Sequence, residues 1–266
     1  MTYPETFEVS LRGHTLQAAL RTKLDRAFWT RWLPNGWEAD TFDLIENHVR
    51  EGTVVLDIGA WIGPISLYAA ALGGRVISLE PDPVAYASLA ENVRLNDKLP
   101  GSIEPLHTAF GAAKGTLRIF GNRKGFGTSG SSSIGLSHRW ITVPVTTPDD
   151  LIARAGSAEN IVIKVDIEAH EFFCGKALSR LRSDLGAVMQ LSLHPAMLAK
   201  SMWWRRLMGT ADREAVRRTH DLLGEFQGCD LIVPHMPGAN LHDAVEAHMF
   251  PEEGAGFDLT VIAQPR

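Results

Sequence analysis

The sequence has little cysteine, no long apolar run and no excess of positive charge. Two cysteines among 266 residues exclude a disulfide framework and favour a reducing, cytoplasmic environment. The most apolar stretch, residues 65–72, is far shorter than the ~20 residues of a membrane-spanning helix, so no stable membrane insertion is expected. The first residues carry acids early and lack the apolar segment of a secretory signal, so none is expected.

The charge balance is mildly acidic. The chain has 26 lysines and arginines against 31 acidic residues, a net charge of -5 and an isoelectric point near 6.1. A protein that binds nucleic acid through a broad basic face needs the opposite balance, so we expect no nucleic-acid partner. The hydrophobic share of 45% is ordinary for a folded chain, and the length suits one large domain.

Short apolar segments alternate with helical patterns along most of the chain. Strands are predicted at residues 53–58, 75–79, 102–106, 115–120, 140–145, 161–166, 187–193, 230–233 and 258–263. Helices are predicted at residues 64–72, 83–96, from 147 onward, and 212–226. This alternation predicts an α/β fold with a doubly wound, mostly parallel sheet. Such sheets bind ligands beyond the carboxyl ends of their strands, where functional residues are therefore expected.

The turn at residues 57–63 (DIGAWIG) follows a buried strand and opens a helix, as a nucleotide-binding turn requires. A dinucleotide site needs glycine where this chain has Trp61 and Pro64, and Asp57 would repel a diphosphate. S-adenosylmethionine carries no phosphate and has an ammonium and a sulfonium group, which favour a nearby acid. We therefore predict this cofactor, with a dinucleotide-dependent dehydrogenase as the alternative. The predicted contacts in the turn are Asp57, Gly59, Ala60 and Gly63.

Glu80 ends the next strand and is followed by Pro81. A carboxylate at this place accepts hydrogen bonds from both hydroxyls of a ribose, so both residues are predicted to border the cofactor. The alternative is that the glycines only form a turn and that Glu80 is a solvated helix cap.

Three segments, VVLDIGAWIG, VISLEPDPVAYASLAENVRLN and IVIKVDIEAHEF, together resemble the FkbM family of S-adenosylmethionine-dependent methyltransferases. The resemblance covers about residues 36–194 and is most specific in Lys164-x-Asp166-x-Glu168-x-x-Glu171. It implies a seven-stranded, Rossmann-like methyltransferase sheet and O-methylation of a hydroxyl on a sugar or secondary metabolite. It also implies a class I methyltransferase domain at residues 51–266, with residues 1–50 as an N-terminal strand and helix extension, in one globular unit.

Acids cluster after the strand at residues 161–166. Asp166 is placed to bind the methionine ammonium or to orient an acceptor hydroxyl, and Glu168 follows it closely. Methyl transfer is an in-line displacement, so positioning carries much of the rate. A base that accepts the hydroxyl proton adds about 10²–10⁴-fold. In the alternative, Glu168 and Glu171 are ordinary acids stabilised at a helix N-terminus.

His194 ends the following strand and is a candidate general base, because imidazole titrates near neutrality. The family often has an acid two residues earlier, where this chain has Ser192, so the partner that orients His194 is not evident. A buried structural histidine is the alternative. The predicted catalytic residues are thus His194, Glu168 and Asp166.

The chain departs from the family at other places too. Ala169 and His170 replace Gly-Ala, and we expect His170 to be an exposed loop histidine rather than a second base. Trp61 replaces a common asparagine, which predicts an unusual acceptor pocket. By the same resemblance, Glu38 and Phe110 are predicted to border the cofactor.

The remaining predictions concern partners. We expect a small-molecule or carbohydrate acceptor, a homo-oligomer as one option, and no metal site, because the histidines toward the C-terminus lack ligand spacing. The loose segment 121–133 is either a lid or a linker, and residues 197–208 are placed to wall the acceptor site or to form an interface. N-methylation of a small amine and cofactor binding without turnover are the alternative functions.

Overall fold

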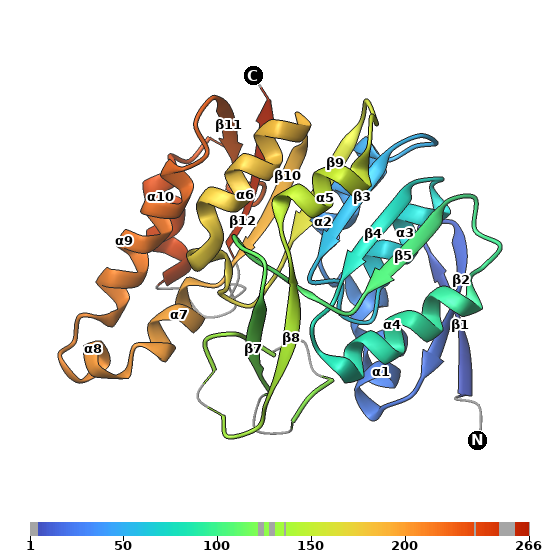
Figure 1. Cartoon of the computed structure of the whole chain (residues 1–266), viewed down its shortest axis with the longest axis horizontal. Helices are drawn as coiled ribbons and strands as arrows, with labels where there is room; N and C mark the ends of the chain where they lie inside the picture. Colours follow the sequence, from blue (N-terminus) through green and yellow to red (C-terminus); the bar gives the residue numbers. More distant parts are fainter. Residues whose placement is uncertain are drawn as a thin grey trace.

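The computed structural model describes residues 5–121, 125–127, 131–135, 137–236, 238–249 and 259–265, with the backbone alone for 248–249. Seven strands form one sheet in the order β11-β12-β10-β9-β3-β4-β5 (Figure 1). Neighbouring strands from β10 to β5 in this order are parallel, whereas β12 is antiparallel to both β10 and β11. The predicted α/β fold with a doubly wound, mostly parallel seven-stranded sheet is confirmed.

The strands of this sheet are β3 (Val54–Ile58), β4 (Arg75–Leu79), β5 (Ser102–Leu106), β9 (Ile161–Val165), β10 (Val188–Leu193), β11 (Cys229–Ile232) and β12 (Leu259–Pro265). The other strands are β1 (Glu5–Leu11), β2 (His14–Leu20), β6 (Ala109–Phe110), β7 (Thr116–Phe120) and β8 (Trp140–Thr146). The helices are α1 (Lys23–Ala27), α2 (Ala39–His48), α3 (Pro64–Ala71), α4 (Pro83–Leu95), α5 (Pro148–Ala155), α6 (Glu171–Leu185), α7 (Pro195–Ser201), α8 (Trp203–Leu207), α9 (Ala211–Gly224) and α10 (Leu241–Met249). A π-helical turn (Phe28–Trp32) and a 3-10 turn (Leu33–Asn35) lie between α1 and α2.

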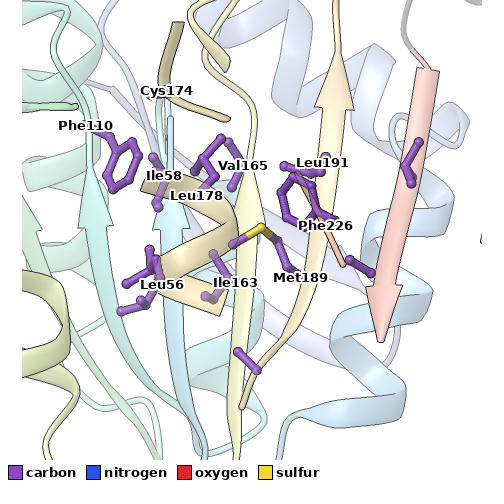
Figure 2. Close-up of a cluster of buried hydrophobic side chains, with 14 of the residues drawn as sticks. Leu56, Ile58, Phe110, Ile163, Val165, Cys174, Leu178, Met189, Leu191 and Phe226 are labelled. Atoms are coloured by element: carbon purple, nitrogen blue, oxygen red, sulfur yellow. The ribbon is translucent and has the colours of Figure 1, made fainter. Parts of the chain in front are cut away.

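Helices cover both faces of the sheet. Leu56 of β3 and Ile163 of β9 point to the face that α5, α6 and α9 cover, and Figure 2 shows Leu178 of α6 packed against them. Val55 and Val162, one residue earlier in each strand, point to the face that α2 and α3 cover. This alternation follows from the two-residue period of a strand, and continuous apolar strands result because both faces are buried.

Local sequence signals fix where the helices begin. The Asp82 carboxylate accepts hydrogen bonds from the N–H groups of Val84 and Ala85 at the start of α4. Thr147 and Asp150 form a capping box at the start of α5, as the Thr-Pro-Asp-Asp pattern predicts. These caps satisfy N–H groups that have no partner within a helix, and they hold each helix directly behind a strand end.

Two additions flank the main sheet. β7 and β8, which the sequence predicts as strands, belong to a separate three-stranded sheet in which β8 pairs with both β6 and β7. The hairpin β1–β2 lies against α4, where Asn92 accepts a hydrogen bond from the Ala19 N–H and donates one to the Ile62 carbonyl. The described part of the N-terminal segment thus contains the strands β1 and β2 and the helices α1 and α2. A domain boundary at residue 50 stays a prediction.

No helix within the described ranges is long and apolar enough to cross a bilayer.

Candidate active site

One cavity lies where the strand ends meet, and it encloses about 990 Å³ of space including its opening to solvent. β3, β4, β9 and β10 each contribute the residues directly after their last one, and β7 of the small sheet forms a further wall through Leu117 and Ile119. The sequence-predicted residues that line it are Glu38, Gly59, Ala60, Glu80, Pro81, Phe110, Asp166, Glu168 and His194. Asp57 and Gly63 do not line it.

Asp57 lies in the core below the cavity instead. Its carboxylate accepts a 2.5 Å hydrogen bond from Ser66, and burial raises its pKa. Lys164 is opposite it in the register of β3 and β9, and the Lys164 ammonium is 3.7 Å from Asp57 and 3.6 Å from Asp166. Burial alone would lower the pKa of Lys164, but the nearby carboxylates outweigh it and the pKa is raised. Asp57 therefore supports the turn through Lys164, and direct cofactor contact by Asp57 stays a prediction.

Gly63 has a supporting place as well. It is the N-cap of α3 in a left-handed conformation, with φ of 89° and ψ of 25°. Pro64 follows as the first helical residue, where its missing N–H leaves no hydrogen bond unmade. Gly63 thus turns the chain into α3, which fixes the position of the loop that lines the cavity.

Glu80 lies at the cavity wall with both carboxylate oxygens engaged. The N–H groups of Trp61 and Asp82 each donate to one of them over 2.7 Å. Burial nevertheless raises the pKa of Glu80 to about 8. Each carboxylate oxygen can accept a second hydrogen bond, so Glu80 can still bind two ligand hydroxyls.

Glu38 approaches the same cavity from the N-terminal side. It begins α2 in a left-handed conformation with φ of 45°, and it makes no side-chain capping bond. Its Oε2 is buried and accepts no hydrogen bond among the described residues, and burial raises its pKa to about 7. A buried acceptor without a donor suits a ligand that brings an N–H group.

Asp166, Glu168 and His194 converge on the other side of the cavity, and we call them the strand-end cluster. His194 Nε2 is 3.5 Å from Asp166 Oδ1 and 3.9 Å from Glu168 Oε2. Glu168 and Ala169 both have positive φ, 54° and 69°. This left-handed pair turns the chain sharply after β9, which brings the Glu168 carboxylate back toward His194.

Glu171 holds the far side of the His194 ring. Its Oε1 accepts the His194 backbone N–H over 2.9 Å and lies 3.2 Å from His194 Nδ1. Glu171 is fully buried, and burial opposes a charged imidazole, but Glu171 and the cluster acids raise the pKa of His194 well above 6.5. The partner that orients His194 is not evident from the sequence. The chain supplies it from the first residue of α6 rather than from position 192.

His170 differs from its expectation. It lines the cavity and is only partly accessible, and its Nδ1 lies 2.7 Å from the Ser133 hydroxyl. The prediction that His170 is an exposed loop histidine is therefore wrong. The His170 imidazole lies between the cavity and the loop around Ser131 and Ser133. Both serines line the cavity, so part of the loose segment 121–133 forms a wall; residues 122–124 and 128–130 of it lie outside the described ranges.

Aromatic residues form the wall near Glu38. The Trp61 ring packs against Phe28 with centroids 4.7 Å apart and lies 6.2 Å from Trp37. Trp37 and Trp61 both line the cavity. The sequence indicated a role for Trp61 but none for Trp37, because nothing in the linear pattern shows that these two rings lie close together. Thr108, which follows β5, also lines the cavity and was not predicted to do so.

The segment 197–208 does not contribute to the cavity. Trp203 and Trp204 of α8 stack on each other with centroids 3.7 Å apart, and Trp204 is 65% exposed. The predicted wall of the acceptor site is therefore absent from this segment, and a role in an interface stays a prediction.

The groups present fit S-adenosylmethionine. Glu38 Oε2 is buried and accepts no hydrogen bond among the described residues, which suits an ammonium group, and Asp166 Oδ1 is a second buried acceptor of this kind. Glu80 has the geometry for ribose hydroxyls, and Pro81 and Phe110 add apolar surface beside it. One region of the cavity is thus acidic and the neighbouring region is apolar, like the two ends of the cofactor.

Comparisons with known proteins point to methyltransferases. Residues 30–112 match the family described as the TRM5/TYW2 methyltransferase domain. A curated relative, the hexuronic acid methyltransferase AglP of Haloferax volcanii, is 23% identical over 152 residues, which are 57% of this chain and 61% of AglP. The chain therefore spans about three fifths of that relative's length. This family match covers less than a third of the chain, so it identifies a methyltransferase sequence in the first half of the sheet.

Solved structures of similar architecture include two with informative names. The methyltransferase FkbM from Methylobacillus flagellatus KT has a TM-score of 0.45 and 15% identity, covering 86% of this chain and 52% of its own. The M. jannaschii tRNA m1G37 methyltransferase has a TM-score of 0.43 and 9% identity, covering 98% of this chain and 56% of its own. Membership of the FkbM family stays a prediction.

The prediction of no nucleic-acid partner is wrong on these findings. The similar proteins include one named for tRNA, and another is named as a putative rRNA methylase from Clostridium thermocellum, with a TM-score of 0.41 and 13% identity over 85% of this chain and 95% of its own. The error has a physical source, because net charge sums over the whole chain whereas a binding face is local. A net charge of -5 excludes a uniformly basic surface and nothing more.

Proposed function

We propose that the chain is an S-adenosylmethionine-dependent methyltransferase that methylates a hydroxyl oxygen. The observation that carries this proposal is the placement of Glu80 on the cavity wall, one strand from the turn at Gly59 and across from the strand-end cluster. Neighbouring strand ends thus offer a hydrogen-bond acceptor for ribose hydroxyls, a glycine turn that lets a cofactor lie close to the backbone, and a set of polar groups for the acceptor hydroxyl. A dinucleotide fits less well, because the acids Glu38, Glu80 and Asp166 around the cavity would repel a diphosphate.

In this proposal each group has one task. Glu38 binds the methionine ammonium and Glu80 binds the ribose. The predicted contacts at Gly59, Ala60, Pro81 and Phe110 line the same cavity and complete the cofactor site. When bound, the cofactor supplies an electrophilic methyl group on a sulfonium. The strand-end cluster then faces the acceptor hydroxyl and favours the departure of its proton, since the bond to oxygen forms as that proton leaves.

A carbohydrate acceptor is part of the proposal. The relative AglP is named for hexuronic acid, and we carry that class over to this chain as the first acceptor to test. Transfer of a labelled methyl group to uronic acids, to simple sugars, to small amines and to tRNA would compare the candidates. Label in an amine or in tRNA, with none in a hydroxylated sugar, would contradict the carbohydrate acceptor.

Replacing Glu80 with glutamine is expected to weaken S-adenosylmethionine binding about 10–100-fold, because hydrogen bonds to a charged acceptor contribute about 1.5–3 kcal/mol. Calorimetric titration measures the change. Glu104→Gln is the matched control, since Glu104 lies on the adjacent strand β5 in an exposed ion pair with Arg154. Unchanged binding in Glu80→Gln, or tight NAD binding by the unmodified chain, would contradict the assigned site.

The affinity for S-adenosylmethionine is also expected to rise with pH through the pKa of Glu80, about 8 in the free protein because of burial. Below that pKa a proton must leave before the carboxylate can accept both ribose hydroxyls, which weakens binding up to about tenfold per pH unit. Asp82 and Lys164 are the charged groups that act on Glu80, and the glutamine variant keeps both.

Titrations between about pH 6.5 and 8.5 would compare the unmodified chain with Glu80→Gln, in which this dependence disappears. Any titration of the free cofactor affects both proteins equally, so the difference between their slopes reports on Glu80. Equal slopes would show that Glu80 does not exchange its proton on binding.

A further inference from the structure

We propose that the strand-end cluster of Asp166, Glu168 and His194 binds a divalent cation. Each residue offers one ligand atom, and these atoms all lie within 4.8 Å of one another. The separations of 3.5 Å and 3.9 Å from His194 Nε2 to the two carboxylates need only a small contraction to surround an ion at ordinary ligand distances. The two strand ends bring these residues together, so no spacing along the chain reveals the site.

The buried Glu171 prepares His194 for this role. Its carboxylate lies at Nδ1 and also accepts the backbone N–H of His194, which fixes the ring in one orientation. With Nδ1 engaged as the donor, Nε2 is the ring atom that faces Asp166 and Glu168. Histidines that bind metals have this arrangement, in which a carboxylate behind the ring raises its basicity as a ligand.

Charge and open positions also favour a divalent ion. Lys164 lies beside Oδ2 of Asp166, whereas Oδ1 is buried and accepts no hydrogen bond from any described residue. Oδ1 is therefore the oxygen available to an ion. Two carboxylates and one imidazole form a mixed oxygen and nitrogen ligand set, which suits Mn²⁺ or Zn²⁺ better than a purely oxygen-bound ion. Three protein ligands on one side leave coordination positions open toward the cavity.

The ion would select the acceptor, a step that rests on the proposed methyl transfer. An ion with open positions favours an acceptor that offers two neighbouring oxygens, such as a hydroxyl beside a carboxylate or a second hydroxyl. Coordination lowers the pKa of the hydroxyl, so its proton passes to water. The oxygen lone pair then forms the new bond to the methyl carbon, while the S–CH₃ bond breaks with its electron pair returning to sulfur.

Binding of Mn²⁺ alone to the full chain, freed of metals with a chelator, tests the site. We expect one Mn²⁺ per chain by electron paramagnetic resonance. His194→Gln and Asp166→Asn should each weaken it at least about 10-fold. His220→Gln is the control, because His220 contacts His242 in an exposed pair outside the cluster, and this variant should bind Mn²⁺ normally. Melting temperatures without metal would identify any variant that fails to fold, and Glu168→Gln provides a third variant at a partly accessible side chain.

Glu171→Gln distinguishes a metal site that depends on the orientation of His194 from non-specific binding of cations by an acidic pocket. It keeps all three ligands and is expected to weaken Mn²⁺ binding about 10–100-fold. No binding at millimolar Mn²⁺, or binding that all three ligand variants leave unchanged, would overturn the inference. S-adenosylmethionine binding measured with the chelator present is independent of it. If that binding persists without a Mn²⁺ site, the inference alone fails; if it is absent, the proposed function fails whatever the metal result.

Discussion

Replacing Lys164 with methionine is expected to lower the free energy of unfolding by about 3–5 kcal/mol, the usual effect of removing one partner of a buried ion pair. Lys164 is 3% exposed and donates a 2.8 Å hydrogen bond to the Gly59 carbonyl. It is also the cation between Asp57 and Asp166. Methionine keeps the volume of the side chain, so the loss reports on charge rather than on packing.

Urea denaturation would measure this loss, and a second substitution would assign it. Asp57→Asn in the Lys164→Met background should recover part of the stability, because Asp57 is fully buried and its uncompensated charge is the main cost. Lys114→Met is the control, since Lys114 is 78% exposed in its ion pair with Asp150, and such surface pairs contribute about 0–1 kcal/mol. Losses of equal size in the two lysine variants would contradict the central place of Lys164.

The main sheet could be predicted because its signals are local. Segments such as residues 53–58 and 161–166 are short, apolar and rich in β-branched residues; Gly59 follows the first, and the second ends in Asp166. A strand buried on both faces requires such a composition. The cavity could be placed for the same reason, since parallel strands end at one edge and Glu80 and Asp166 follow two of them.

The pairing of Glu171 with His194 could not be predicted in this way. The two residues are 23 positions apart and belong to α6 and the end of β10. Their contact depends on how α6 begins after the left-handed turn at Glu168 and Ala169, and neither residue is a glycine that would announce such a turn. Within the strand itself, position 192 holds a serine and offers His194 no carboxylate.

The pairing of two strands in the N-terminal hairpin could not be predicted for a different reason. β1 is mostly exposed, with Val9 and Leu11 as its buried residues, so its apolar alternation is weak. What fixes the hairpin is polar and distant: the Asn92 side chain on α4 binds the backbone of β2. Long-range side-chain bonds of this kind leave no period in the sequence, whereas strand and helix patterns do.

The second large effect is expected at Gly59. Its φ is 86°, and a β-carbon at this position would lie 1.7 Å from the Asp166 carbonyl oxygen. The left-handed conformation alone costs an alanine about 1–2 kcal/mol. The clash is with backbone rather than with a flexible side chain, so β3 and the end of β9 would have to separate, which adds about 1–3 kcal/mol or more. We therefore expect Gly59→Ala to lose about 2–5 kcal/mol of stability and most cofactor binding.

Gly36→Ala isolates the conformational part of this cost. Gly36 has a φ of 88°, close to that of Gly59, and a β-carbon there would meet nothing within 4 Å. It should lose only about 1–2 kcal/mol in the same denaturation experiment. The difference in lost stability between the two variants measures the cost of the close approach between Gly59 after β3 and Asp166 after β9. Equal losses would mean that glycine at position 59 is needed for its backbone conformation alone, and the close approach of Asp166 would then have to be relaxed in solution.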